Sequence, residues 1–383
     1  MNLHKELNLL IELSKKNRNH KQIINDLSSI QNWENFKNAI IAHGLLPIIF
    51  KKLTQEMHQY VPIDILKELH QEYNHLLKKN MLMSIELTSL MRLLEDNNIN
   101  ALAIKGPTLS ILAYGNVINR PYADLDILID KKDIFKTATI LLEHQYSSSY
   151  NIKLLKEKVY LKLDNDFNFF TKQGTHIEVH WRLLRGIIGE DLPFNRYFTT
   201  KTKVRINQTS VNTLNLEDLL VYLCIHGSKH AWERLEWIND IHMLIDNNAI
   251  DWEKVLKSAE EMDAFISLYL GLHLAKTFYA IVLPSYINEE LQNEKIKLLV
   301  QEVIYFLNSD LINSANYTLY KKLNWFQAQL ISSKKKKLQH YISRYLKVTR
   351  NDYLFLPLPS YLIWLYYFIK PFRIAYKIII KTD

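Results

Sequence analysis

Two aspartates, Asp124 and Asp126, flank a single leucine in the run ADLDILID. The apolar residues Leu125, Ile127 and Ile129 alternate with them, a pattern that predicts a strand with both carboxylates on one face. Two like charges side by side are costly without a cation, and a hard divalent ion is the simplest compensation. The pair therefore predicts a site for Mg²⁺, with Mn²⁺ as the alternative. The other interpretation, and the commoner one for so short a pattern, is two acids at a strand end that point to water.

A phosphate-binding turn is predicted upstream, where Lys105-Gly106-Pro107 separates the strand-like ALAI from the helix-like TLSILAYG. Gly106 permits close approach of the backbone, and Pro107 suits the first turn of a helix. The start of such a helix offers amide groups and a positive dipole end to an anion. Thr108 adds a hydroxyl, and Lys105 and Arg120 add positive charge near the same place. With this turn before them, the two aspartates are better explained by a metal and nucleotide site.

The elements that must position these residues divide the chain into three regions. Residues 1–98 have helical periodicity, residues 99–215 contain short strand-like runs with helices between them, and residues 216–383 are helical again. The candidate strands are ALAI, DLDILI, VYLKL, FNFF, THIEVHW, KVRI and SVNTL. Asn215 is expected to cap the first helix of the third region. We predict an α/β (α+β) fold, with a small mixed sheet flanked by N-terminal helices and a C-terminal helical bundle.

The composition is that of a packed globular protein. Hydrophobic residues make up 48% of the 383 positions and charged residues 23%. The formal charge of +8 favours polyanionic neighbours, although lysines in this number also serve solubility. The single cysteine, Cys224, excludes an intramolecular disulfide framework, and the N-terminus shows no secretory leader pattern. We therefore expect a cytoplasmic protein.

The C-terminal segment is unusually aromatic. Its run YLIWLYYFIKPFRIAYKIIIK is broken by Lys370 and Pro371 and falls short of the ~20 apolar residues that a spanning helix requires. Two interpretations are open for residues 360–383: a closing helix of the C-terminal bundle, or a peripheral contact with an anionic membrane.

Two histidines, His226 and His230, are four residues apart and share a helix face with Leu219 and Leu223. The spacing superficially suggests a zinc site, but the metalloprotease motif needs a glutamate after the first histidine, and Gly227 stands there. We interpret the pair as hydrogen-bonded core histidines that hold the helical region against the sheet.

Three stretches of the chain carry a family resemblance: KGPTLSILAYGNVINRPYADLDILI, IEVHWRL and HGSKHAWERLEWINDI. They resemble the DNA polymerase β-like nucleotidyltransferase superfamily, and more narrowly the bacterial family of uncharacterised nucleotidyltransferases. The resemblance covers residues 101–245. It implies metal-dependent transfer of a nucleoside monophosphate from an NTP to an acceptor, which could be a small molecule, a glycan, a peptide or RNA.

The resemblance also implies roles for single residues. Asp124 and Asp126 would hold the metal, and Gly106 and its neighbours would receive the nucleotide phosphates. A third carboxylate is usual in the superfamily. Glu178 is our choice, in preference to the two aspartates of the LDNDF run, either as a third ligand or as a base toward the acceptor.

The acceptor side of the cleft is expected to use residues of the two later family-like stretches. We name His180, His226, His230, Arg234 and Asp240 for it. Arg234 and Asp240 lie at helical spacing on this stretch, and the sequence leaves open whether they form a buried contact.

One position departs from the superfamily pattern. The usual turn has a second glycine followed by serine, whereas Pro107 stands here and supplies neither a hydroxyl nor an amide donor. Two functions are therefore compatible with the sequence: an active nucleotidyltransferase, or a catalytically inactive protein of the same fold that binds nucleotide, RNA or glycolipid.

Overall fold

The structure is a computed structural model that describes residues 3–16, 19–149, 161, 164–184, 188–309, 317–346 and 348–380. Within these residues the fold is mixed α/β, as predicted. The strands are β1 Ala101–Ala103, β2 Asp124–Ile129, β3 Ser147–Ser148, β4 Asp166–Phe170, β5 His176–His180, β6 Thr202–Ile206 and β7 Thr209–Thr213. They form one sheet in the order β3-β4-β5-β2-β1-β7-β6.

The helices precede, interrupt and follow the strands. The N-terminal helices are α1 Lys5–Ser14, α2 His20–Ser28, α3 Trp33–Ala42, α4 Leu46–Glu56, η1 His58–Tyr60 and the long α5 Ile63–Asp96. Between strands lie α6 Pro107–Tyr114, η2 Lys131–Asp133, α7 Ile134–Glu143 and α10 Phe194–Thr199. After the sheet come α11 Leu216–Lys229, α12 Leu235–Asn247, α13 Trp252–Glu261, α14 Phe265–Tyr279, α15 Ser285–Glu290, α16 Glu294–Asn308, α17 Tyr317–Gln329, α18 Lys334–Leu346, α19 Arg350–Phe355, η3 Ser360–Leu365 and α20 Tyr366–Ile380.

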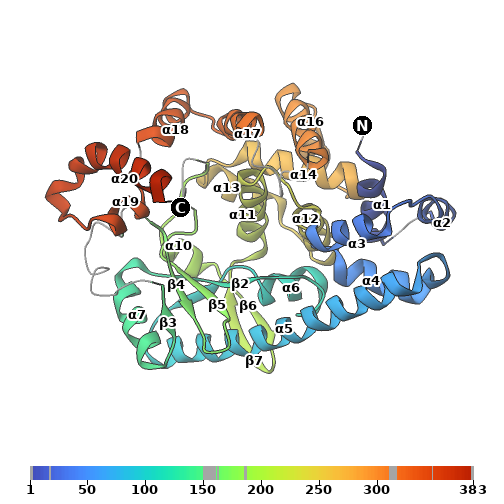
Figure 1. The fold of residues 1–383 in the computed structure, drawn as a ribbon, viewed down its shortest axis with the longest axis horizontal. Coiled ribbons are helices and arrows are strands. Elements are labelled where there is room, and N and C mark those ends of the chain that lie inside the picture. The colour runs from blue at the N-terminus through green and yellow to red at the C-terminus, as the bar shows by residue number, and fades with distance from the viewer. Residues whose placement is uncertain are drawn as a thin grey trace.

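The sheet lies between two groups of helices. Figure 1 shows α5 running along one side of the strands, with α11, α12 and α14 on the other side. Strand β2 is central, pairing antiparallel with β1 and parallel with β5. Since both faces of β2 are covered, its residues after Asp124 are all buried, as is usual for a parallel strand inside a layered fold.

Two clusters of buried apolar residues form the core. The first joins the N-terminal helices to α6, α11, α12, α14 and α16, and the second joins α5, α7 and the strands. Tyr353 of α19 and Tyr366 of α20 belong to the second cluster, so the C-terminal helices pack on the part of the molecule that contains the sheet. In the described part of the chain, no helix is both long and apolar enough to cross a membrane.

Most sequence-predicted elements are confirmed. Six of the seven candidate strands coincide with β1, β2 and β4–β7, and the Asn215 side chain accepts a hydrogen bond from the Asp218 amide at 2.7 Å. The seventh candidate, VYLKL at 159–163, lies outside the described residues except for Leu161. The short elements β3 and α10 were not predicted.

Candidate active site

Five acidic and histidine side chains meet where β2 and β5 run side by side. The parallel register places Asp124 opposite His176, and Asp126 opposite Glu178. His180 follows on β5, two residues after Glu178 on the same strand face. The pattern of alternation therefore brings the predicted carboxylates, and the predicted His180, to one face of the sheet.

Asp126 is held between two cationic groups. Its Oδ2 atom lies 3.2 Å from Lys105 Nζ, and its Oδ1 atom lies 3.0 Å from His180 Nε2. Although burial raises the pKa of Asp126, Lys105 and His180 hold it well below its usual range. The carboxylate is therefore charged at neutral pH.

Burial opposes a charge on His180, but hydrogen bonds to Asp126 and Glu178 raise the pKa of its imidazole to about 9. Its Nε2 atom lies 3.3 Å from Glu178 Oε2, and the hydrogen bond between them lowers the pKa of Glu178. At neutral pH His180 is therefore a proton donor that connects the two carboxylates.

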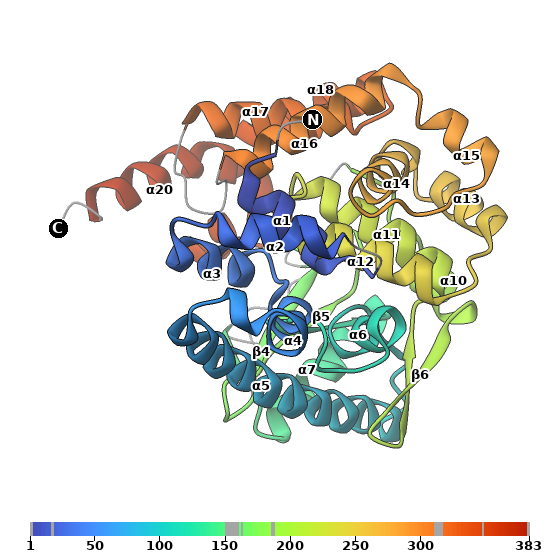
Figure 2. The same ribbon diagram turned by 90° about the vertical axis from the view of Figure 1, so that its right-hand side faces the viewer.

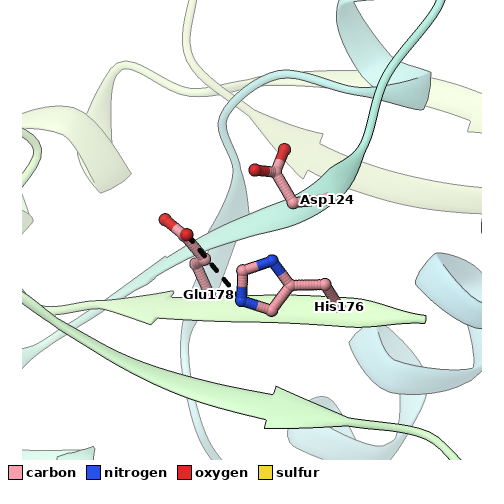
Figure 3. Close-up of side chains that lie close together, drawn as sticks. All are labelled: Asp124, His176 and Glu178. Atoms are coloured by element: carbon pink, nitrogen blue, oxygen red, sulfur yellow. Dashed lines mark ion pairs between the residues drawn. The ribbon is translucent and has the colours of Figure 1, made fainter. Parts of the chain in front are cut away.

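Asp124 lies in a different electrostatic setting from Asp126. Burial and the neighbouring charge of Asp126 raise its pKa. Asp124, His176 and Glu178 present ligand atoms that all lie within 4.8 Å of one another. Figure 3 shows these three side chains on β2 and β5. A cation at this position would relieve the like charges that raise the pKa of Asp124.

The donor atoms fit a divalent cation. In a second group, Asp126, Glu178 and His180, the polar atoms also lie within 4.8 Å of one another, and with His180 protonated it is the two carboxylates that could hold a cation. Oxygen-rich sites of this kind suit Mg²⁺ and Mn²⁺. The buried Oδ2 atom of Asp126 accepts no hydrogen bond of normal geometry despite its ion pair with Lys105. The strongest partner of this oxygen is therefore the Lys105 ammonium group, which a metal bound here would have to displace.

The Lys105-Gly106-Pro107 turn has the geometry expected of it. Gly106 adopts φ +61°, which disfavours a side chain, and α6 begins at Pro107. A Cβ atom on Gly106 would lie 3.5 Å from the Asp124 carbonyl oxygen, so the turn passes directly over the start of β2. Thr108, in contrast, is fully buried, and its hydroxyl donates to the Lys105 carbonyl at 2.9 Å. The Thr108 side chain is therefore turned into the core.

Arg120 is buried in an ion pair. Its Nε donates to both carboxylate oxygens of Asp240, at 2.9 and 3.0 Å, and Tyr114 Oη donates to Asp240 Oδ1 at 2.7 Å. The contact between Arg234 and Asp240 that the sequence left open is not formed, since Asp240 pairs with Arg120 and Arg234 lies 3.4 Å from Glu236. Arg234 immediately precedes α12, and a six-residue step does not return to the same helix face.

A pocket of about 410 Å³ opens beside this turn. Lys105, Gly106, Asp124 and Asp126 form part of its wall. The remaining lining residues are Leu76, Lys79, Arg120, Pro121, Tyr122, Ala123, His226, His230, Glu233, Arg234, Glu236 and Trp237. The carboxylate pair and the glycine turn therefore face a cavity of the size that binds small molecules.

The wall contributed by α11 and α12 is aromatic. The rings of His226 and His230 lie 4.9 Å apart, and each lies within 5.5 Å of the Trp237 ring. Burial lowers the pKa of His226, and burial also lowers the pKa of His230 to about 4. Both imidazoles are therefore neutral at pH 7 and can accept a hydrogen bond.

Residues 29–280 match the family described as uncharacterised nucleotidyltransferases. The chain belongs to this family. Among solved structures, the lincomycin-bound lincosamide antibiotic adenylyltransferase LnuA is 14% identical, with a TM-score of 0.27, over 36% of this chain and 82% of its own. An antigenic nucleotidyltransferase-like protein from Paracoccidioides brasiliensis is 15% identical, with a TM-score of 0.31, over 52% of this chain and 96% of its own. Comparison with curated proteins gave no match.

In this member of the family the predicted residues fall into two groups. Those gathered at the carboxylates or around the pocket are Lys105, Gly106, Arg120, Asp124, Asp126, Glu178, His180, His226, His230 and Arg234. Thr108 and Asp240 lie outside the pocket wall. The pocket residues that sequence reasoning missed include Lys79, Glu233 and Glu236, and His176 was missed at the carboxylates. His176 had a signal in the sequence, because it lies on the same strand face as Glu178.

Proposed function

We propose that this nucleotidyltransferase transfers a nucleoside monophosphate from an NTP to an acceptor in a reaction that depends on Mg²⁺ or Mn²⁺. The observation that carries the proposal is the meeting of Asp124, Asp126 and Glu178 beside the Gly106 turn, next to the pocket. In the reaction an acceptor oxygen forms a bond to the α-phosphorus. The bond from that phosphorus to the bridging oxygen breaks, and pyrophosphate leaves.

Asp124, Asp126 and Glu178 would hold the metal, which supplies charge neutralisation on the triphosphate and on the leaving pyrophosphate. The remaining contributions are those of the chain itself. The Gly106 turn exposes the start of α6 to phosphate oxygens, because the first amides of a helix have no partner within it. Lys105 carries a positive charge at the same place.

Protonated His180 is suited to positioning and not to proton abstraction. It donates toward Asp126 and Glu178 and so fixes two carboxylates whose charges would otherwise repel. Glu178, whose pKa is lowered, is charged and serves either as a metal ligand or as the base that takes the proton of an acceptor hydroxyl. Catalysis would then rest on positioning and electrostatic stabilisation.

The acceptor is assigned to the α11–α12 side of the pocket. Neutral His226 and His230 can accept hydrogen bonds from acceptor hydroxyl groups, and Trp237 offers an aromatic wall. Arg234, which is exposed at the rim, suits an acceptor with a negative group. This arrangement is compatible with a small molecule, a glycan, a peptide end or RNA.

Incubation with each labelled NTP, Mg²⁺ and pooled candidate acceptors tests the proposal. The wild type should release pyrophosphate and label an acceptor, and the double variant Asp124→Asn, Asp126→Asn should not. Equal turnover by the double variant would sink the assignment. Alanine at His226, His230 or Arg234 should reduce turnover. Unchanged turnover with a lower melting temperature would make those residues structural.

A second function is favoured by one observation: the ammonium group of Lys105 is a direct cationic partner of Asp126. A catalytically inactive protein that binds nucleotide, RNA or glycolipid could use the same site in this form. Nucleotide binding that persists in excess EDTA, without pyrophosphate release, would support this alternative over the enzyme.

A further inference from the structure

The positive charge of the chain is concentrated at one end. Residues 334–380 contain ten lysines and arginines and a single acidic residue, Asp352. Residues 1–333 contain 37 basic and 38 acidic residues, so they are almost neutral. The net charge of +8 therefore belongs to the C-terminal helices and not to the nucleotidyltransferase site.

The same helices expose an aromatic stripe that points away from the protein. Tyr361, Trp364, Phe368 and Phe372 follow one another at steps of three and four residues along η3 and α20, and are 75%, 56%, 65% and 75% exposed. Such steps place side chains on one face of a helix. The Trp364 and Phe368 rings lie 6.2 Å apart in an edge-to-face arrangement. We call these four residues the aromatic stripe.

The opposite face of the segment is anchored. Tyr366 is fully buried in the core cluster that contains the sheet, and Arg373 donates through Nε to Asp352 Oδ1 at 2.6 Å. Asp352 in turn caps α19 through Thr349. The helix is thus fixed by one face while the stripe stays outside, and Figure 2 shows α20 extending beyond the body of the molecule.

We propose that the aromatic stripe and the basic C-terminal helices form a docking surface for an anionic lipid bilayer. Tryptophan and tyrosine favour the boundary between headgroups and acyl chains, and lysine and arginine are attracted to anionic headgroups. A helix with an exposed apolar face lies in the plane of that boundary and does not cross it, and the exposed Lys334 and Lys335 at the start of α18 supply positive charge for anionic headgroups. This agrees with the absence, among the described helices, of one able to span a bilayer.

Charge favours a membrane over a second copy of this chain. Two copies joined through this surface would bring two strongly basic segments together, which costs free energy. An anionic bilayer compensates the charge and covers the apolar rings at once. Nucleic acid would compensate the charge but is a separate outcome of the test.

Flotation of the full-length protein with vesicles tests the proposal. Vesicles of phosphatidylcholine with phosphatidylglycerol should bind the wild type, phosphatidylcholine alone should not, and added salt should weaken the binding. The variant Trp364→Ser, Phe368→Ser removes half of the stripe. Lys334→Glu with Lys335→Glu reverses two exposed charges, and each variant should lower partitioning by about tenfold or more.

A matched control removes equally exposed apolar groups elsewhere. Val282 and Tyr286 are 89% and 47% exposed near α15, and Val282→Ser with Tyr286→Ser should leave flotation unchanged. Circular dichroism and the melting temperature establish that all variants are folded. The proposal is overturned if anionic vesicles do not bind the wild type, or if the stripe and control variants bind alike. It is also overturned if the stripe variant loses self-association or RNA binding while vesicle binding is unchanged.

Discussion

At the scale of single residues, Asp126 has a cationic partner on each carboxylate oxygen, whereas Asp124 lies among like charges. Lys105 and His180 belong to different elements, and both lie within 3.2 Å of Asp126. A divalent ion that uses Asp126 must therefore compete with, or displace, the Lys105 ammonium group. The released ammonium group would then be available to a phosphate oxygen.

Substitution of Lys105 tests this competition. Lys105→Gln leaves Asp126 buried without one cation, which should destabilise the metal-free protein by roughly 3–5 kcal/mol, as in other broken buried pairs. Mn²⁺ should then raise the melting temperature of the variant more than that of the wild type, because the ion takes the place of the ammonium group. Lys79→Gln, in the wall of the same pocket, is the control. Equal stabilisation of all three proteins by Mn²⁺ would contradict the account.

The histidine pair predicts a pH dependence of stability. Folding lowers the pKa of His230 to about 4 through burial, so the unfolded chain binds its proton more readily below pH 6.5. The stabilisation is complete above the unfolded pKa and is lost as the pH falls from about 6.5 toward about 4. In urea titrations His230→Gln should flatten the stability curve in this window. A curve as steep as that of the wild type would exclude His230 as a cause.

The sequence predicted which residues gather at the carboxylates better than it predicted what each one contacts. Asp124, Asp126 and Glu178 could be placed because strand alternation determines which face they share. The sequence could not predict that the Thr108 side chain turns into the core or that Asp240 pairs with Arg120. A hydroxyl at the start of a helix can point either way, and Arg120 lies 120 residues from its partner.

At the scale of elements, the segment between α6 and β2 is attached to α12 through Arg120 and Asp240. Tyr114 at the end of α6 reaches the same carboxylate, and Asn239 Nδ2 donates to the Tyr114 hydroxyl at 3.0 Å. This buried network joins the phosphate-binding turn and β2 to the helix that supplies Trp237. The distance across the pocket is therefore set by polar contacts as well as by apolar packing.

The network can be tested by a double-mutant cycle. Arg120→Met leaves Asp240 fully buried without its cation, with the Tyr114 hydroxyl still bonded to it, and should cost roughly 3–5 kcal/mol of unfolding free energy. Adding Asp240→Leu removes that charge and should recover much of the loss. If the loss of unfolding free energy in the double variant equals the sum of the losses in Arg120→Met alone and Asp240→Leu alone, the pair does not act as a unit. Titration of the double variant with NTP also decides whether Arg120 contributes to nucleotide binding.

The long elements were predictable and the short ones were not. Alternation and helical periodicity identified β2, β5 and α11, each of which has a clear buried face. Strand β3 has two serines, Ser147 and Ser148, and exists only because it pairs with β4. Helix α10 spans Phe194–Thr199, too few residues for its period to be recognised.

At the scale of the whole molecule, the family match and the pocket cover the same parts of the chain. The match spans residues 29–280, and the pocket takes residues from α5, from the turn before α6, from β2, and from α11 to α12. The predicted boundaries at 98 and 215 fall between α5 and β1 and between β7 and α11. One buried cluster nevertheless runs from the N-terminal helices to α16, so division into domains stays a prediction.

The basic C-terminal helices lie beyond the family match. The positive charge and the candidate active site are thus separated along the chain: a nearly neutral body holds the candidate active site, and a basic end presents the aromatic stripe. Loss of vesicle binding in the stripe variant should therefore leave nucleotide binding intact.

The most direct test of the central claim needs no knowledge of the acceptor. Electron paramagnetic resonance can count the Mn²⁺ ions that bind together with nonhydrolysable NTP analogues. Three proteins are compared: the wild type, the double variant that combines Asp124→Asn with Asp126→Asn, and the control variant Asp130→Asn, whose substitution directly follows β2. We predict stoichiometric binding that falls at least about tenfold in affinity in the double variant and is unchanged in the control. Equal Mn²⁺ binding by all three proteins would contradict a metal site at these carboxylates.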